Sequence, residues 1–241
     1  MKISFAIPAH DEQELLPSTL QAIHASAQAT GLPYEIIVAD DASTDDTVRV
    51  AREHGAMVIS IDRRQIAAAR NAAGRAASGD VVFFVDADTR VSPDVVRDGI
   101  AAIETGAIGG GFLTSFDGRI PLYARVLLPV ALTLFRFAGV TGGATMFCTR
   151  EALDAVGGWD ETLFASEEIT FARELKRHGR FIIPRSKIVT SGRKLRDYSG
   201  LEVFGLVLKL AWRGRKGVRQ RDGLELWYGP RTRSDTPTPS A

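Results

Sequence analysis

The sequence predicts an α/β protein with a mostly parallel central sheet flanked by helices. In the first half of the chain, short runs rich in β-branched and aromatic residues alternate with longer helix-like stretches. The strand-like runs are almost wholly apolar, as strands are when helices cover both faces of a parallel sheet. With 241 residues, 45% of them apolar, the chain is long enough to bury a substantial core.

Four strands and three helices are expected before residue 90. The strands are expected at residues 3–7, 35–39, 57–61 and 81–85. The helices are expected between them, at residues 12–29, 45–55 and 65–78. Gly55 and Gly79 follow two of these helices, where glycine commonly ends a helix.

The second half is less regular. Residues 119–140 form an apolar, helix-like stretch that Arg125, Pro129 and Arg136 interrupt, so it is too broken to span a membrane. A glycine turn, a strand and a short helix that ends at Gly157 are expected next. Residues 166–179 then predict a helix with acidic residues in its first turn and basic residues in its last, as the helix dipole favours.

Acidic residues follow three of the expected strands. Because the carboxyl ends of parallel strands meet at one edge of a sheet, and ligands bind beyond that edge, we expect these side chains to converge on one rim. They are Asp11 and Glu12, Asp40 and Asp41, and Asp86 and Asp88.

Asp86 and Asp88 form a D-x-D pair directly after an apolar strand. Two like charges at a partly buried position repel each other, and a divalent cation is the natural compensation. Carboxylate oxygens suit Mg²⁺ or Mn²⁺, which complete their shells with water and substrate phosphates. The alternative is that one of the two residues only caps the following turn.

Three other site types were weighed against the residues. The string "DADT" at 86–89 also satisfies the D-x-D-x-T pattern of haloacid-dehalogenase-type phosphatases, and the acidic pairs suit a non-catalytic receiver-like or nucleotide-sensing domain. Both interpretations need a lysine that follows these acids in the chain. No lysine occurs between Lys2 and Lys176, so the first one after Asp88 is 88 residues away. The dinucleotide fingerprint G-x-G-x-x-G is absent.

Four motifs, in order, resemble those of family 2 glycosyltransferases of the GT-A fold. They are "IPAHDE", "IIVADDASTDDT", "AAARNAAGRAASGDVVFFVDADT" and "TGGATMFCTREALDAVGGWDETLFASEEITFARELKRHG". The resemblance covers roughly residues 2–190. It implies an enzyme that moves a sugar from a nucleotide-diphosphate donor to an acceptor hydroxyl with inversion, assisted by Mg²⁺ or Mn²⁺. A UDP-sugar is the expected donor and a GDP-sugar the alternative.

The resemblance also implies roles for the residues that follow the first two strands. Pro8 and Glu12 line the nucleotide pocket. Asp41 accepts a hydrogen bond from the nucleotide base, with Asp40 beside it.

Three further residues are placed on the donor side by the same resemblance. Arg70 faces the ribose and the diphosphate; the alternative is a surface arginine on an alanine-rich helix. Asp86 meets the ribose or the sugar, and Asp88 holds the metal that bridges the diphosphate.

The catalytic base of the family is usually the Asp of a Glu-Asp pair that opens a helix, and the matching pair here is Glu167-Glu168. We expect Glu168 to take the proton, with Glu167 as the alternative. The non-catalytic interpretation is that both acids complement the helix N-terminus, with Ser166 as its N-cap.

The resemblance places Gly142, Gly143 and Trp159 on the acceptor side, where the glycines let backbone approach closely. Trp159 offers an apolar face on which a sugar or lipid stacks, or else is an ordinary core residue.

The C-terminal part of the chain is basic. Residues 185–233 carry 13 basic and 4 acidic residues, against 17 and 24 in residues 1–184. Five of these bases follow an apolar run, which predicts a helix on an anionic membrane surface or a packed helix with a solvated end. They are Arg213, Arg215, Lys216, Arg219 and Arg221. Aromatic residues do not alternate with them, so no nucleic-acid partner is expected.

These observations predict how the chain is organised. A catalytic domain is expected over residues 1–195, with a nucleotide-binding half at about 1–90 and an acceptor half at about 91–195. An amphipathic basic segment at 196–230 and a disordered tail at 231–241 follow. The single Cys148 excludes an internal disulfide and, with no secretory signal, predicts a cytoplasmic protein, either free or attached to the cytoplasmic face of the membrane. Acceptors with a free hydroxyl are expected, lipid-linked ones among them.

Overall fold

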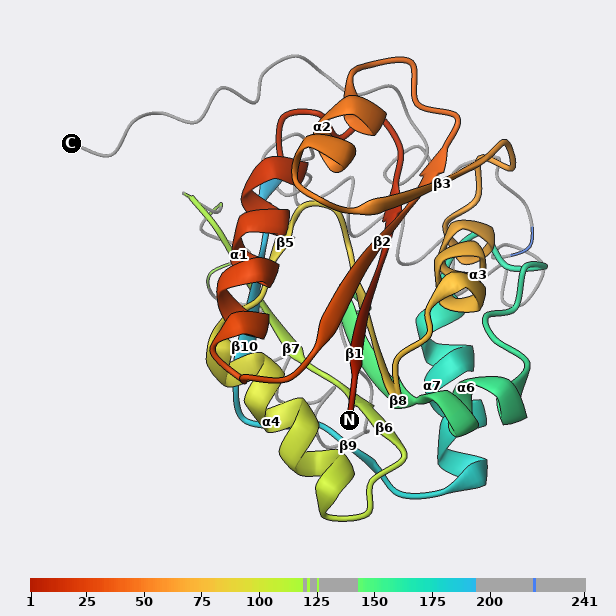
Figure 1. Cartoon of the computed structure of the whole chain (residues 1–241). Helices are drawn as coiled ribbons and strands as arrows, with labels where there is room; N and C mark the ends of the chain where they lie inside the picture. The colour runs from red at the N-terminus through yellow and green to blue at the C-terminus, as the bar shows by residue number, and fades with distance from the viewer. Residues whose placement is uncertain (119–120, 122–124, 126–142, 194–218, 220–241) are drawn as a thin grey trace.

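The structure is a computed structural model that describes residues 1–118, 121, 125, 143–193 and 219 (Figure 1). Most of the apolar stretch at 119–140 lies outside the described residues. The same is true of Gly142, of the basic segment at 196–230 apart from Arg219, and of the tail at 231–241.

A seven-stranded sheet forms the centre of the molecule, in the order β3-β2-β1-β4-β8-β6-β9 (Figure 1). The first four strands in this order are mutually parallel; β8 runs antiparallel to both β4 and β6, and β9 is parallel to β6. The α/β class and the mostly parallel sheet predicted from the sequence are therefore confirmed. The strands are β1 (Ile3–Ala9), β2 (Tyr34–Asp41), β3 (Met57–Ile61), β4 (Val81–Val85), β6 (Gly109–Gly111), β8 (Thr145–Thr149) and β9 (Phe181–Ile182).

The three helices expected in the first half are present as α1 (Leu16–Gln28), α2 (Thr47–Glu53) and α3 (Ile66–Ala76). The start of α1 lies four residues later than expected, with Pro17 in its first turn, where a missing N–H costs nothing. In the second half, α6 (Arg150–Val156) ends at Gly157 with a φ of 73°, and α7 (Glu167–His178) ends at Gly179, both as expected.

Besides the short strands β6 and β9 of the large sheet, two features are absent from the sequence expectations. One is α4 (Pro93–Glu104), whose N-cap Ser92 accepts a hydrogen bond from the backbone of Val95. The other is a small second sheet in the order β5-β10-β7, built from Thr89–Arg90, Lys187–Thr190 and Leu113–Phe116. Its strands are two to four residues long, too short for a pattern of alternating residues to reveal.

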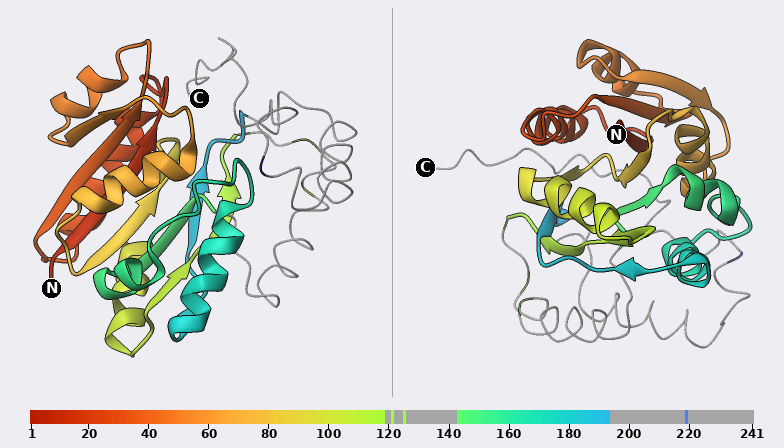
Figure 2. Two further views of the ribbon diagram at one scale, coloured as in Figure 1. Left: turned by 90° about the vertical axis from the view of Figure 1, so that its right-hand side faces the viewer. Right: turned by 60° about the horizontal axis from the view of Figure 1, so that its bottom comes forward.

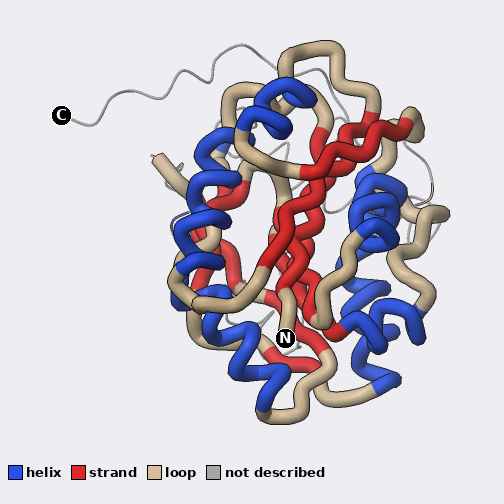
Figure 3. Tube along the Cα trace, in the orientation of Figure 1, coloured by secondary structure: helices blue, strands red, loops and turns tan. Residues whose placement is uncertain are grey.

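The helices cover both faces of the large sheet, so the molecule has two cores. One face packs against α1 and α4 and buries Phe5, Phe83, Phe112 and Phe147. The other packs against α3, α6 and α7 and buries Phe84, among others. Figures 2 and 3 show the two helical layers with the strands between them. Within the described residues, no helix combines the length and the apolar character needed to cross a bilayer.

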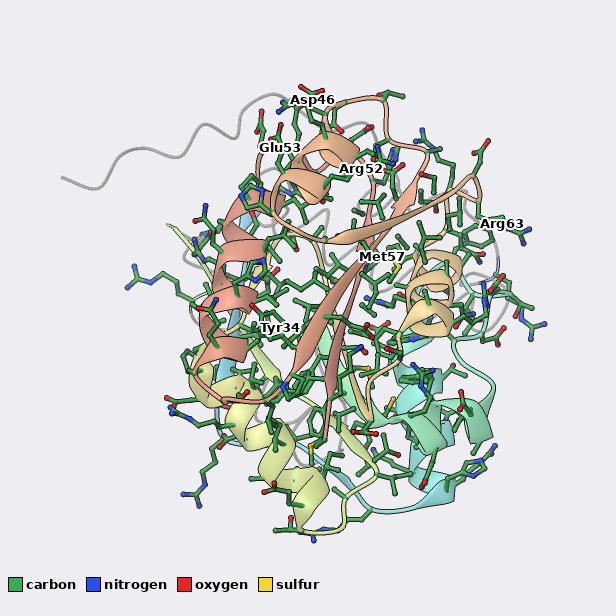
Figure 4. The ribbon with its side chains drawn as sticks, viewed as in Figure 1. Tyr34, Asp46, Arg52, Glu53, Met57 and Arg63 are labelled. Carbon is green, nitrogen blue, oxygen red and sulfur yellow. The ribbon has the colours of Figure 1, made fainter. Side chains whose placement is uncertain are left out.

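Several exposed side chains lie on the edge strand β3 and around the neighbouring helix α2. Met57 on the edge strand β3 is 48% exposed, and Asp46, Arg52 and Glu53 lie around α2 (Figure 4). Arg63 points away from the body of the protein (Figure 4).

A group of polar side chains, here called the polar clamp, joins the N-terminal ends of β1 and β2 to the turn before β4, at the end of the sheet opposite the rim. Glu35, at the start of β2, accepts hydrogen bonds from Lys2 and Ser4 of the β1 end and from Ser78 before β4. Partial burial alone raises the pKa of Glu35, but these hydrogen bonds outweigh it and lower the pKa to about 2.

Gly79 belongs to this clamp and does not end a helix, so its expected role as a helix cap was wrong. The C-cap of α3 is Ala77. A Cβ at position 79 would lie 2.6 Å from the hydroxyl of Ser4 and 2.8 Å from the carbonyl of Lys2. Glycine is required there because the turn before β4 crosses β1 at close range.

We expect Glu35→Gln to flatten the acid dependence of stability. A carboxyl whose pKa is lowered in the folded state stabilises the fold above its unfolded pKa of about 4.3, and this contribution is lost as pH falls toward 2. Urea titrations between pH 7 and pH 2.5 should therefore show a gap in unfolding free energy between wild type and Glu35→Gln that closes as the solution becomes acidic.

Glu53→Gln is the matched control for this measurement. Glu53 is 55% exposed and pairs with Arg49 on the same helix, so its replacement should change stability by about 0.5 kcal/mol or less. A gap for Glu35→Gln that does not vary with pH would contradict the expectation.

Candidate active site

Loops from five strands meet at the rim. β1, β2 and β4 end there, at Ala9, Asp41 and Val85. The antiparallel β8 begins there, because Thr145 pairs with Val85, and Thr190 of β10 arrives beside Thr89. The convergence of the acidic residues predicted from the sequence follows from this register.

The two aspartates at the end of β2 have different surroundings. Asp41 accepts hydrogen bonds from the backbone N–H groups of Arg63, Arg64 and Gln65, at 2.6 to 2.8 Å. Its carboxylate therefore fixes the 62–65 loop that leads into α3. Asp40 is 4% exposed, and its Oδ1 atom is buried with no hydrogen-bond partner.

The loops at the rim hold four non-glycine residues in the left-handed region, with φ between 49° and 61°: Asp11, Ala42, Arg64 and Ser166. Such conformations cost energy and tend to cluster where a site constrains the backbone. At Asp11, the strained turn is held by a hydrogen bond from the backbone of Thr44 to the carboxylate. Asp11, Ala42 and Arg64 lie in the loops that follow β1, β2 and β3, on the predicted donor side, and Ser166 directly precedes α7.

Arg70 is buried at the centre of the site, which excludes the interpretation of a surface arginine. Its side chain is 4% exposed, and it donates to Asp86 and to Glu167, each at 2.8 Å. Its guanidinium also lies 4.5 Å from the centroid of the Trp159 ring. Burial alone lowers the pKa of Arg70, but the two carboxylates outweigh burial and raise it.

Trp159 lies in the core, which favours the second of the two interpretations that the sequence left open. It is 3% exposed and stacks on Phe171 with ring centroids 4.1 Å apart. With Phe171 and Arg70 both over its ring, the side chain offers no face for a sugar. Trp159 instead packs its ring against the guanidinium of Arg70.

Residues of α3 also hold the loop that leads into α7. Asn71 donates to the carbonyl of Trp159 and accepts from its backbone N–H. Gln65 donates to the carbonyl of Leu163. The N-terminus of α7 is thus tied to the same helix that carries Arg70. Ser166 occupies the N-cap position of α7, where the non-catalytic interpretation placed it, but its side chain forms no capping hydrogen bond.

The two glutamates at the start of α7 differ in their partners. Glu167 is 8% exposed and paired with Arg70. Glu168 lies against Gly143, where a Cβ would come within 3.0 Å of its Cγ; Gly143 has a φ of 76°. Burial first, and then repulsion from Glu167, raise the pKa of Glu168 to about 7. A carboxyl with such a pKa can accept a proton near neutral pH.

Two residues near Asp88 were missed by the sequence analysis. Arg193, three residues beyond β10, donates to Glu12 at 2.6 Å and to Asp88 at 3.3 Å. Thr190 donates to the other carboxylate oxygen of Asp88, at 3.1 Å. Asp88 and Glu12 are separated from Arg193 by 105 and 181 residues, so no local pattern relates them.

The carboxylates of the site suit a metal ion that the substrate also coordinates. Among the described residues, no group of three His, Cys, Asp or Glu side chains is placed to bind a metal ion. Mg²⁺ and Mn²⁺ commonly take only one or two carboxylates and fill their shells with water and phosphate oxygens. Asp88, 12% exposed, fits such a site.

Comparison with known proteins agrees with this geometry. The profile of "Glycosyl transferase family 2" matches residues 4–145, more than half of the chain. The chain belongs to glycosyl transferase family 2. The phosphatase and receiver-like alternatives are thereby excluded, and the D-x-D strand lies within the matched region.

Two relatives illustrate the kinship of this family 2 glycosyltransferase. A dolichol-phosphate mannosyltransferase of Pyrococcus furiosus is 33% identical over 149 residues, which is 57% of this chain and 41% of the relative. An undecaprenyl-phosphate 4-deoxy-4-formamido-L-arabinose transferase of Serratia proteamaculans is 33% identical over 112 residues, covering 44% and 34%. The chain thus spans less than half the length of these relatives.

Solved structures show the same GT-A fold. Staphylococcus aureus TarS in complex with UDP-GlcNAc has a TM-score of 0.63 at 19% identity, over 87% of this chain and 65% of TarS. A Pyrobaculum calidifontis mannosyltransferase in complex with GDP-Man and Mn²⁺ also has a TM-score of 0.63, at 20% identity, over 85% of this chain and 59% of its own.

We expect Arg70→Gln to destabilise the protein by about 3 to 5 kcal/mol, because it leaves the buried Glu167 without its counter-charge. Adding Glu167→Gln should restore part of the loss, since the uncompensated charge is then gone. Chemical denaturation of the two variants and of wild type provides the measurement.

Arg75→Gln on the same helix is the control. Arg75 is 70% exposed, and its replacement should cost about 0.5 kcal/mol or less. Equal losses for Arg70→Gln and Arg75→Gln would show that Arg70 does not hold the site together.

Proposed function

We propose that this glycosyltransferase moves a sugar from a nucleotide-diphosphate donor to an acceptor hydroxyl, with inversion at the anomeric carbon and with a divalent metal. The observation that carries the proposal is the Arg70 bridge. One guanidinium holds Asp86 of the D-x-D strand and Glu167 of α7, each at 2.8 Å. It thereby sets the predicted donor side and the predicted base side at a fixed separation, as a displacement reaction requires.

On the donor side, Asp40 becomes the better candidate for base recognition. Asp41 uses both carboxylate oxygens on the 62–65 loop, whereas Asp40 has a buried oxygen that no protein group satisfies. An N–H of a nucleotide base would satisfy it, and unsatisfied buried acceptors are costly. On the β1 side Ala9 pairs with Asp40, and Pro8 and Glu12 are proposed to line the same pocket. UDP is the expected nucleotide and GDP the alternative.

On the diphosphate side, Asp88 would hold the metal. A divalent ion bound there neutralises the charge that develops on the departing diphosphate. TarS with UDP-GlcNAc and the mannosyltransferase with GDP-Man and Mn²⁺ support a nucleotide sugar and a metal for this fold.

On the acceptor side, Glu168 is proposed as the general base. Its pKa, raised to about 7 by burial and by Glu167, matches the requirement that a base be deprotonated and still basic near neutral pH. Glu167 has Arg70 as its counter-ion, which makes it the poorer proton acceptor. Gly143 packs against Glu168 and so sets the position of its carboxyl group.

The names of the relatives raise a second acceptor class, a polyprenyl phosphate. A phosphate monoester has a second pKa of about 6 and is already ionised at neutral pH. Such an acceptor has little need of a base. The carboxyl group of Glu168 therefore favours a hydroxyl acceptor, and the same variant distinguishes the two.

We expect Asp88→Asn to lower the Mn²⁺-dependent affinity for UDP or GDP by roughly tenfold or more, because a ligand charge is lost while the shape is kept. Calorimetry with and without Mn²⁺ is the measurement. Asp94→Asn on α4, 74% exposed, should leave the affinity unchanged. Metal-dependent binding that survives Asp88→Asn at full strength would remove Asp88 from the metal site.

We expect Glu168→Gln to reduce transfer to a hydroxyl acceptor by roughly 10² to 10⁴, the usual contribution of a positioned base. The wild-type rate should fall as pH drops below about 7, because the base becomes protonated, and the variant should lose this dependence. Transfer at saturating donor is the measurement, with donor affinity measured separately.

Two companion variants sharpen this test. Glu167→Gln should slow transfer much less, and Glu168→Asp should lose much of the activity because Gly143 packs against the longer side chain. Full activity of Glu168→Gln on hydroxyl acceptors would place the base elsewhere. Full activity on polyprenyl phosphate alone would identify a phosphate acceptor.

A further inference from the structure

Arg193 lies between two acidic residues that follow different strands, Glu12 after β1 and Asp88 after β4. Its Nη2 atom is 2.6 Å from Glu12 Oε1 and 3.3 Å from Asp88 Oδ2. The side chains of Arg193 and Glu12 are 9% and 6% exposed, so these charges are shielded from water. A buried pair of carboxylates needs a nearby cation, and in this structure the guanidinium provides it.

We propose that Arg193 is an exchangeable cation. Without a donor it neutralises Asp88 and Glu12; when the metal and a nucleoside diphosphate bind, it leaves Asp88 and contacts the diphosphate. This inference rests on the proposed function, because it takes Asp88 as the metal-binding carboxylate. It assigns a role to a residue outside the motifs by which the family was recognised.

The distances explain why the guanidinium and the metal compete. A guanidinium 3.3 Å from Asp88 Oδ2 would lie within a few ångströms of a metal bound to the same carboxylate. Two cations at that separation repel strongly when they are shielded from water. Metal alone must therefore displace Arg193 from Asp88 and leave a buried positive charge with less compensation.

A nucleoside diphosphate removes this penalty. Its phosphate oxygens match the geometry of a guanidinium, which binds phosphate in a bidentate manner. Metal binding and nucleotide binding are then coupled: each makes the other more favourable, by the same factor.

Asp88 can release Arg193 without losing its position. Thr190 donates to Asp88 Oδ1 at 3.1 Å and also accepts from Thr89 at 2.9 Å. The backbone carbonyl of Asp88 accepts from Ser191. These contacts do not involve the guanidinium, so the metal-binding carboxylate stays in place during the exchange.

The test compares wild type with Arg193→Gln, using Mn²⁺ alone and UDP or GDP as probes. Mn²⁺ affinity without nucleotide is measured by electron paramagnetic resonance, and nucleotide affinity at saturating Mn²⁺ by calorimetry. We expect Arg193→Gln to bind Mn²⁺ alone roughly tenfold more tightly and to bind the nucleotide at saturating Mn²⁺ roughly tenfold more weakly. Tenfold changes are of the size usual for coupling between two binding sites. A residue with only a structural role would weaken both.

Two further variants separate charge from packing. Arg193→Lys keeps the positive charge and should keep the weak binding of Mn²⁺ alone. Its affinity for the nucleotide should fall, because the planar guanidinium group is lost. Arg97→Gln removes an exposed positive charge on α4, where Arg97 is 57% exposed, and should keep the wild-type coupling factor. Thermal melts of all variants confirm that they are folded.

The outcomes are distinct. Unchanged or weaker Mn²⁺ binding by Arg193→Gln, or equally tight Mn²⁺ binding by Arg193→Gln and Arg193→Lys, would overturn the exchange. A wild-type protein that binds neither UDP nor GDP at any Mn²⁺ concentration would instead overturn the proposed function. The measurement with Mn²⁺ alone still decides the competition at Asp88 in that case.

Discussion

The site depends on one buried guanidinium. Arg70 reaches the rim from the middle of α3, a helix whose other buried residues are mostly alanines. Small side chains let the helix lie close to the sheet, so the one long side chain extends between β4 and α7. Desolvation of its charge is offset by Asp86, Glu167 and the face of Trp159. Without this cation, nothing among the described contacts would bring the two carboxylates to a shared position.

The charges of the rim are divided between two arginines. Arg70 is the partner of Asp86 and Glu167, and Arg193 that of Glu12 and Asp88. Glu168 lies beside the first group, and electrostatic repulsion from Glu167 and Asp86 helps to raise its pKa. The arrangement therefore produces one carboxyl group that holds its proton far more readily than an ordinary glutamate does. Two neighbouring glutamates of the same helix turn acquire different chemistry from their surroundings alone.

Local sequence patterns predicted what depends on local structure. The apolar runs located β1, β2 and β4 because these strands are mostly buried, and they also located the edge strand β3, which is partly exposed. The residues that follow parallel strands then had to share one end of the sheet. α4 could have been found as well, since Ser92-Pro93-Asp94 is a typical helix start.

Long-range contacts could not be predicted in this way. An arginine in an alanine-rich helix looks the same whether it faces solvent or the core, and only the position of Glu167, 97 residues later, makes Arg70 a buried bridge. Arg193 was counted with the surplus of basic residues near the C-terminus, since its acidic partners lie far back in the chain. Gly79 was misread because its close neighbours, Lys2 and Ser4, are also distant in sequence.

The small sheet has a consequence for how the protein matures on the ribosome. Its middle strand, β10, pairs with β5 and β7 and delivers Thr190 and Arg193 to Asp88. Glu12 emerges 181 residues before the arginine that neutralises it, a delay of roughly 10 to 40 s at ordinary rates of synthesis. For the last 105 residues of that interval the nascent chain already contains the acidic residues that follow β1, β2 and β4 but lacks the guanidinium of Arg193. The growing polypeptide thus passes through a stage in which Glu12 and Asp88 lack this counter-ion, and the synthesis of β10 and Arg193 ends that stage.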